Sequence, residues 1–254
     1  MATNQAPVTF QKANKRQAKL RLALFGPSGS GKTYTALKVA TALGGRIALI
    51  DTERGSASKY AGEFDFDVLE LETFQPQQYI NATLAAQKAG YDILIIDSLS
   101  HAWTGKQGLL EQHGNITARD PRHDSFAAWR DVTPIHNNLL DALTQANLHL
   151  IATMRAKSEY VRETDSNGKT KITEVGVQPV QRDGTEYEFD VVGRLDQDNT
   201  LVIIKTRCSA LSEVVIKKPG REIATTLKAW LSDGSKPVPA RQVDTATGEV
   251  TEQP

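Results

Sequence analysis

The chain has 254 residues, of which 39% are hydrophobic and 24% charged, and its 30 basic residues balance its 30 acidic ones. This is the composition of a globular protein with a substantial core, and the zero net charge excludes any inference about partners from overall charge. A single cysteine excludes an internal disulfide. No signal-peptide core is evident, and the apolar runs fall far short of the roughly 18 to 20 residues of a membrane helix. We therefore expect a cytoplasmic protein.

The N-terminal segment, residues 1–19, is polar and basic. A run of this kind is usually a solvated arm and less often a nucleic-acid contact. Its basic residues include Lys12, Lys15, Arg16 and Lys19.

Four short apolar runs at long intervals predict buried parallel strands joined by crossover helices. They are Leu20–Phe25, Ile47–Ile50, Ile93–Ile96 and Leu148–Ala152. The intervening pattern predicts helices at Thr33–Leu43, from Pro76 to about Ala89, and at 126–146, where Pro134 marks a kink or a restart.

The C-terminal half has a different pattern. Alternating segments at Lys171–Val177 and Glu186–Val192 predict β-hairpins, and Leu201–Lys205 and Glu213–Ile216 predict further strands. The last part, 232–254, is rich in Pro, Thr, Gly and charge without apolar periodicity, which predicts disorder. We therefore expect an α/β fold with a mainly parallel central sheet, made by residues 20–231 between the basic arm and a disordered tail.

A glycine-rich loop joins the first predicted strand to the first predicted helix. Its residues are Gly26, Pro27, Ser28, Gly29, Ser30, Gly31, Lys32 and Thr33. The backbone amides of such a loop can surround a polyphosphate, and the dipole of the following helix favours the negative charge. In this context Lys32 would reach the β- and γ-phosphates and the Thr33 hydroxyl would ligate Mg²⁺. This phosphate loop, Gly26–Thr33, predicts binding of ATP with Mg²⁺.

An acid follows another predicted strand, in the run Asp92–Ser98. Alone, Asp97 would more often be a solvated strand end or a helix cap. Beside a phosphate loop, we expect it to complete the Mg²⁺ site.

The strand Ile47–Ile50 ends in Asp51-Thr52-Glu53, which resembles the Asp-x-Glu strand end of the RecA recombinases and their archaeal and eukaryotic relatives. The resemblance implies a RecA-like P-loop NTPase core in which Glu53 orients the water that attacks the γ-phosphate. It also implies that Tyr60 lies against the adenine ring. The alternatives are a surface carboxylate and a packing tyrosine.

Two further strand ends resemble features of RecA-like proteins. Leu148–Ala152 is similar to the strand whose end carries a polar sensor, but here Thr153-Met154-Arg155 departs from the Asn-Gln pair of the recombinases, so the sensor is Thr153 or Arg155. Lys205-Thr206-Arg207 resembles the Lys-x-Arg pair that ring helicases project into a neighbouring active site. The resemblance implies that Lys205 and Arg207 act in trans; the alternative is surface charge.

A narrower resemblance runs from about Phe10 to Trp230. The segments Gln17–Leu24 and Arg182–Asp190 are similar to those of phage-encoded RecA-like ATPases, an AAA-type family associated with single-strand annealing recombination. It implies a role in phage DNA recombination or replication in the host cytoplasm.

In RecA-like proteins two loops face single-stranded DNA, and they correspond here to residues 98–125 and 155–182. Trp103 and Tyr160 could stack on bases, and cations could contact phosphates. The candidate phosphate contacts are Lys157, Arg162, Lys169, Lys171 and Arg182. Because acids are interspersed, a mixed-charge hairpin exposed to water is the alternative.

We thus expect an ATPase that acts on single-stranded DNA as a homo-oligomer, a filament or a ring. One alternative is a nucleotide-switched loader that binds a recombinase or a single-strand-binding protein through its tail. A small-molecule kinase is disfavoured by Asp51-Thr52-Glu53 and by the lack of an arginine-rich lid. The histidines show no metal-ligand spacing and are expected to be surface or capping residues. They are His101, His113, His123, His136 and His149.

Overall fold

The computed structural model describes residues 18–119, 125–164 and 170–234 and two short paired strands beyond them, Gln242–Val243 and Val250–Thr251. For 159–164 and 170–175 only the backbone is described. Most of the predicted arm at 1–19 and of the predicted tail at 232–254 lies outside the described residues.

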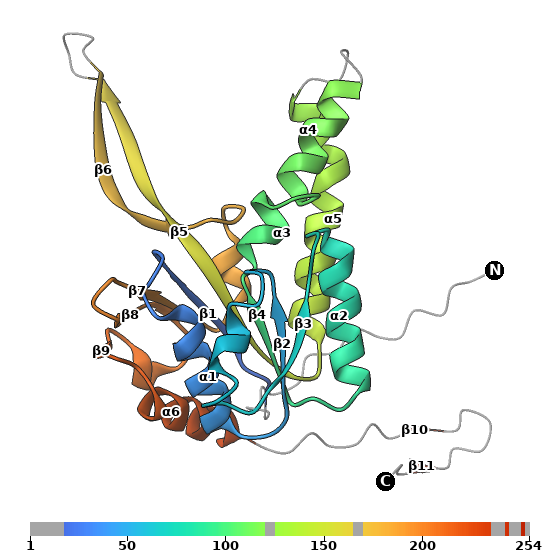
Figure 1. Ribbon diagram of the computed structural model, residues 1–254, viewed down its shortest axis with the longest axis vertical. Coiled ribbons are helices and arrows are strands. Elements are labelled where there is room, and N and C mark those ends of the chain that lie inside the picture. Colours follow the sequence, from blue (N-terminus) through green and yellow to red (C-terminus); the bar gives the residue numbers. More distant parts are fainter. Residues whose placement is uncertain (1–17, 120–124, 165–169, 235–241, 244–249, 252–254) are drawn as a thin grey trace.

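Figure 1 shows the arrangement of the helices and strands. The strands are β1 (Arg21–Gly26), β2 (Ile47–Asp51), β3 (Asp67–Glu70), β4 (Ile93–Asp97), β5 (His149–Thr164), β6 (Thr170–Pro179), β7 (Val191–Leu195), β8 (Thr200–Thr206), β9 (Val215–Lys217), β10 (Gln242–Val243) and β11 (Val250–Thr251). The helices are α1 (Lys32–Leu43), α2 (Pro76–Lys88), α3 (Ser100–Thr104), α4 (Leu109–Arg119), α5 (Ser125–Gln145) and α6 (Arg221–Ser232), with 3-10 turns at Ala57–Tyr60, Thr185–Glu188 and Ser209–Leu211.

The central sheet has the order β3-β2-β4-β5-β1-β7-β8-β9. Pairing is parallel from β3 through β7 and antiparallel between β7, β8 and β9. The expected mixed α/β fold with a mostly parallel sheet is therefore confirmed. Because parallel strands end at the same edge, the loops that follow β1, β2, β4 and β5 meet there.

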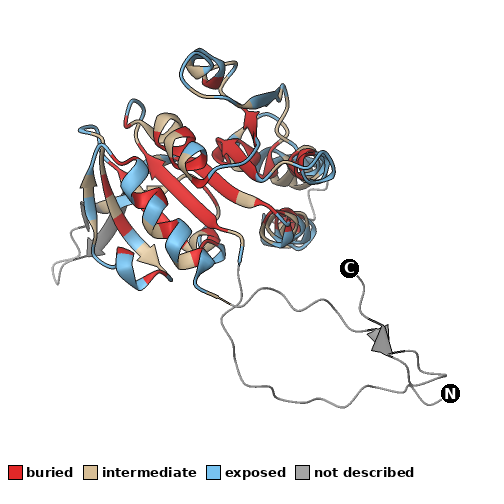
Figure 2. Ribbon diagram, turned by 90° about the horizontal axis from the view of Figure 1, so that it is seen from below, coloured by how far each residue is buried: buried red, intermediate tan, exposed pale blue. Residues whose placement is uncertain are grey.

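The molecule has three layers: the sheet lies between α1 and α6 on one face and α2 and α5 on the other (Figure 2). Successive side chains of a strand point to opposite faces. In β1, Leu22 and Leu24 pack with the buried residues of α1 and α6, whereas Ala23 and Phe25 pack with those of α2 and α5. The continuous apolar runs of β1 and β4 thus reflect burial on both faces, as expected for parallel strands.

A buried arginine connects α5 to the sheet. The Arg21 guanidinium donates hydrogen bonds to the carbonyl oxygens of Leu20, Thr144, Ala146 and Leu148 at 2.6 to 3.0 Å. Three of these carbonyls belong to the end of α5 and the segment that leads into β5, and that of Leu20 directly precedes β1. Arg21 therefore fixes the entry of β5 beside β1.

Most of the predicted elements are present with bounds close to those expected. The helix predicted at 126–146 is α5, and it continues through Pro134. The strand predicted at Glu186–Val192 is wrong: Thr185–Glu188 forms a 3-10 turn, and the strand begins only at Val191. The left-handed backbone of Gly184, with φ of 88°, turns the chain into this short helix.

Two arms project beyond the carboxyl edge of the sheet (Figure 1). One is an antiparallel hairpin in which β5 continues past the sheet and pairs with β6, confirming the predicted hairpin at Lys171–Val177. The sequence Ser166-Asn167-Gly168, which predicts the turn of this hairpin, lies outside the described residues. The other arm is α4 with the first half of α5. None of the described helices is long and apolar enough to cross a membrane.

Candidate functional site

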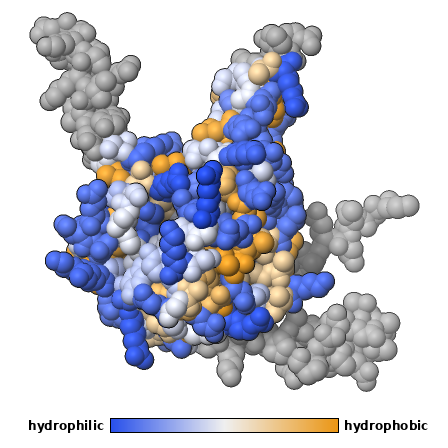
Figure 3. Space-filling view, viewed as in Figure 1, coloured by the Kyte–Doolittle hydropathy of each residue, from blue (hydrophilic) through white to orange (hydrophobic). Residues whose placement is uncertain are grey.

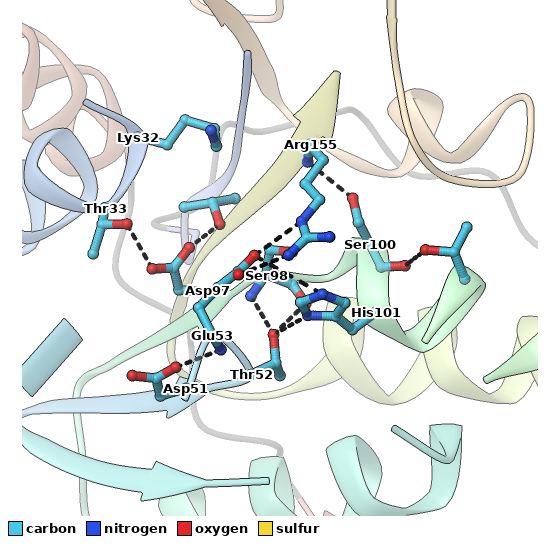
Figure 4. Close-up of polar contacts among 12 residues, drawn as sticks. Lys32, Thr33, Asp51, Thr52, Glu53, Asp97, Ser98, Ser100, His101 and Arg155 are labelled. Carbon is cyan, nitrogen blue, oxygen red and sulfur yellow. Dashed lines mark hydrogen bonds and ion pairs between the residues drawn. The ribbon is translucent and has the colours of Figure 1, made fainter. Parts of the chain in front are cut away.

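Four strand ends bring the predicted site residues together at the carboxyl edge. In the register of the sheet Asp51 of β2 pairs with Asp97 of β4, and Gly26 of β1 pairs with Arg155 of β5. Since β5 lies between β1 and β4, residues distant in sequence surround one surface. Figure 4 shows their side chains.

The conformation of the phosphate loop requires glycine. Gly29 and Gly31 have φ of 79° and 81°, in the left-handed region that other residues avoid. A Cβ on Gly26 would lie 2.3 Å from the carbonyl oxygen of Leu195, so no side chain fits there. The loop therefore packs its first glycine closely against the end of β7.

Lys32 lies within this loop. Its Nζ donates hydrogen bonds to the carbonyl oxygens of Gly26 at 3.0 Å and Pro27 at 2.8 Å. Burial lowers the pKa of Lys32, an effect that the nearby carboxylates of Asp97 and Glu53 oppose. These two carbonyl acceptors are neutral, and an anionic phosphate oxygen would be a stronger hydrogen-bond partner for the ammonium.

The predicted metal ligands are in direct contact. Thr33 Oγ1 donates to Asp97 Oδ2 at 2.6 Å, and the Thr153 hydroxyl donates to the other Asp97 oxygen. Burial raises the pKa of Asp97. Hard oxygen donors of this kind suit Mg²⁺. No cluster of three His, Cys, Asp or Glu suited to a metal exists among the described residues, so Mg²⁺ here would take its other ligands from phosphate and water.

Glu53 is held by a two-point ion pair. Arg155 donates from Nε to Glu53 Oε1 at 3.0 Å and from Nη2 to Oε2 at 2.7 Å. Asp51 fixes the turn that carries Glu53, because its oxygens accept from the backbone amides of Glu53 at 2.6 Å and Ala57 at 3.0 Å. The carboxylate of Glu53 thus has a defined position at the pocket.

The two sensor candidates contact different acids. Thr153 is buried and bonded to Asp97, whereas Arg155 is exposed and paired with Glu53. The sequence left the choice open, and the geometry connects both residues to the site. Of these two sensor candidates, Arg155 is the one that brings a positive charge to the pocket at the phosphate loop.

The pocket at the phosphate loop has a volume of about 520 Å³. Tyr60, the predicted adenine contact, lines it together with Tyr34, and the two rings lie 5.6 Å apart. Sequence reasoning missed Tyr34, although it follows the loop directly. Other residues that line the pocket are Lys32, Thr33, Glu53, Ser56, Asp97 and Arg155.

Lys205 and Arg207 lie away from this pocket. Thr206 pairs with Val191, which is at the start of β7 and beside the start of β1, so the pair lies toward the opposite end of β1 from the loop. Lys205 Nζ donates to the carbonyl oxygens of the 185–188 turn and of Phe189, and Arg207 pairs with Asp190 at 2.9 Å. Within one chain neither residue serves the loop.

The expectation that the histidines are surface residues is wrong for two of them. His101 is 9% and His136 4% exposed. His149 caps the start of β1, since its Nδ1 accepts from the Leu20 amide at 3.0 Å. His123 lies outside the described residues. The sequence offered no signal for the position of His101 beside Glu53.

A second concave surface lies between the two arms, with a volume of about 800 Å³ (Figure 3). We call it the aromatic groove; Trp103, Phe126, Trp129, Arg130, Thr133, Pro134, Lys157, Gln181, Arg182 and Asp183 line it. Two of the predicted DNA contacts, Lys157 and Arg182, therefore share this surface with three aromatic rings. Lys169 lies outside the described residues, as do the side chains of Tyr160, Arg162 and Lys171.

Comparison with known proteins identifies a family. A family model described as "AAA domain" matches residues 18–234, a range that includes the phosphate loop, Asp97, Glu53 and Arg155. A search of curated proteins found no match. The family match covers most of the chain and both arms.

Proposed function

This chain belongs to the AAA-domain family, whose members are nucleotide-binding ATPases, and we propose that it hydrolyses Mg-ATP in response to single-stranded DNA. The observation that supports hydrolysis is the convergence of Lys32, the Thr33–Asp97 pair and Glu53 on one pocket. The proposed setting is phage DNA recombination or replication, as the resemblance of Arg182–Asp190 implies.

The loop residues bind the nucleotide. Lys32 exchanges its two carbonyl partners for phosphate oxygens, and the backbone amides of the loop add further donors. Thr33 and Asp97 would hold Mg²⁺, which when bound neutralises charge on the phosphates. Tyr60 and Tyr34 offer ring faces to the base.

Glu53 accepts a proton from the attacking water once its carboxylate is released from Arg155. The ion pair is weak enough to exchange, because the Arg155 side chain is 50% and the Glu53 side chain 30% exposed. Pairs exposed to solvent contribute only about 0.2 to 1 kcal/mol. A triphosphate carries more charge than one carboxylate, so it can draw the Arg155 guanidinium away from Glu53.

The aromatic groove supports the choice of single-stranded DNA. Phe126 is 84% exposed and lines the groove with Trp103 and Trp129, so an aromatic ring is accessible there. Arg182 lies over the Trp129 ring at 5.5 Å and donates to Thr133, so its cation is held at the groove. Exposed rings that stack on bases, together with cations that contact phosphates, are the usual combination at single-strand sites.

Replacing Phe126 by alanine is expected to weaken single-stranded DNA binding by about 5- to 160-fold, the effect of losing a base stack of roughly 1 to 3 kcal/mol. DNA-stimulated turnover should fall at subsaturating DNA, while turnover without DNA stays unchanged. Leu84→Ala on α2, also an exposed apolar residue, is the matched control. Fluorescence anisotropy at low salt measures binding. Turnover of the unaltered protein that is indifferent to DNA, without binding at low salt, would contradict the DNA role.

We further propose that the protein is a homo-oligomer in which Lys205 and Arg207 serve a neighbouring loop. Both residues lie near the start of β1, whereas the phosphate loop of the same chain follows the end of β1. Mixing Glu53→Gln chains with Arg207→Ala chains should restore part of the activity, because some interfaces then combine an intact loop with an intact arginine. A verified mixed oligomer without recovery would exclude the trans contribution.

A further inference from the structure

His101 lies directly beside Glu53 (Figure 4). Its ring belongs to α3 and stacks on Phe74, with the centroids 4.8 Å apart and the planes 23° apart. Nδ1 is 2.6 Å from Thr52 Oγ1, and Nε2 is 3.9 Å from Glu53 Oε1. The imidazole therefore connects the side chain of Thr52, the residue after β2, to the side chain of Glu53.

The hydrogen bonds of Thr52 indicate which imidazole nitrogen carries the proton. Thr52 Oγ1 accepts from the Ser98 amide at 2.7 Å, and its own proton can go to the Ser98 carbonyl at 3.2 Å or to His101 Nδ1 at 2.6 Å. The shorter contact favours the imidazole. An imidazole that accepts on Nδ1 carries its proton on Nε2, the nitrogen that faces Glu53.

Burial and the Arg155 cation keep His101 neutral near neutral pH. Burial, and then the Arg155 cation, lower the pKa of His101, against the opposing effect of the Glu53 and Asp51 carboxylates. A separate pocket beside the phosphate-loop pocket is lined by His101, Glu53 and Lys106, so Lys106 adds another positive charge near the imidazole. A neutral imidazole can donate from Nε2 to Glu53 without neutralising the carboxylate as a cation would.

We propose that His101 is a positioning residue that holds the Glu53 carboxylate toward the attacking water after Arg155 has turned to the nucleotide. The proposal rests on the proposed role of Glu53. In the present structure Arg155 occupies both oxygens of Glu53. When Arg155 leaves, a small rotation of Glu53 brings Oε1 into hydrogen-bond range of Nε2, about 3.2 Å or less.

The substitutions separate positioning from packing. His101→Leu keeps an apolar side chain against Phe74 but removes both polar contacts, whereas His101→Gln retains one acceptor and one donor. We expect His101→Leu to lower kcat about tenfold, the effect of losing one hydrogen bond to a charged group. KM for ATP should stay within about twofold, since Lys32 and the loop are untouched. His101→Gln should recover most of kcat.

The pH profile provides a readout that packing would not change. The kcat of the unaltered protein should fall as the pH falls through the pKa of His101, because protonated His101 pairs with Glu53 and weakens it as a base. In His101→Gln this loss should move to lower pH. His149→Gln is the control: burial lowers the pKa of His149 to about 4, below the tested range, so the profile should not change.

The outcomes are distinct. If His101→Leu turns over ATP as fast as the unaltered protein, the role of His101 is overturned. The role is also overturned if His101→Leu and His101→Gln lose equal activity and the fall of kcat at low pH is the same as in the unaltered protein. If His101→Leu does not fold, as judged by its Tm, the pH profile of His101→Gln decides alone. Absence of turnover in the unaltered protein would overturn the proposed function and this inference together, whereas turnover with insensitive variants overturns only the inference.

Discussion

Replacing Lys32 by alanine is expected to lower kcat/KM for ATP by roughly 10²- to 10³-fold or more, the effect of removing a preorganised donor to the transferring phosphate. The ammonium is partly buried in the loop and donates to two carbonyl oxygens of that loop, a position that Arg155, paired with Glu53, does not occupy. Phosphate release measures turnover, and titration with a fluorescent nucleotide measures binding. Both should be impaired, because Lys32 contacts the ground state as well as the transition state.

Lys88→Ala is the matched control for this substitution. Lys88 is an exposed lysine at the end of α2, on a helix that does not contribute to the pocket. Its removal should leave kcat/KM unchanged. Full activity in Lys32→Ala, with correct folding shown by an unchanged Tm, would mean that the Gly26–Thr33 loop is not the nucleotide site.

Replacing Glu53 by glutamine should have a comparable effect on turnover and the opposite effect on binding. The amide is nearly the same size but cannot accept a proton from water, so kcat should fall by about 10²- to 10⁴-fold. Because the amide is uncharged, it pairs only weakly with Arg155, leaving the guanidinium available to phosphate. ATP affinity should therefore be unchanged or higher.

Single-turnover measurements distinguish this result from a general loss of structure. Glu70→Gln is the control. Glu70 lies near Glu53, in the pocket lined by His101 and Lys106, but it does not line the pocket at the phosphate loop. A fall in ATP affinity equal to the fall in kcat would show that Glu53 binds nucleotide and has no role in the chemical step. Near-normal turnover would assign the reaction to another group.

Much of the core could be predicted because burial on both faces leaves a strong pattern. β1 and β4 are continuous apolar runs, and each leads into residues with a definite chemistry, the phosphate loop and Asp97. β3 and its neighbourhood were not predicted: Val68 and Leu69 are exposed at the edge of the sheet and form no recognisable pattern. The Glu186–Val192 prediction failed because the alternating pattern did not reveal that Thr185–Glu188 forms a 3-10 turn.

The partners of the site residues could not be predicted in the same way. Arg155 and Glu53 are 102 positions apart, and Thr153 and Asp97 are 56 apart. Which side chains meet across such separations depends on the strand order, in which β5 enters between β1 and β4. The aromatic groove likewise requires α5 and the segment at 181–183 to lie together.

The phosphate loop and the acid of β4 were determined by the sequence alone, because a loop between a strand and a helix needs only local backbone geometry to form an anion site. The tertiary structure alone decided that Arg155 holds Glu53, that the Tyr34 ring lies beside the Tyr60 ring, and that His101 is buried beside the carboxylate of Glu53. The physical reason is that hydrogen bonds and ion pairs act over a few ångströms in space, and only packing of the sheet brings those atoms within that range.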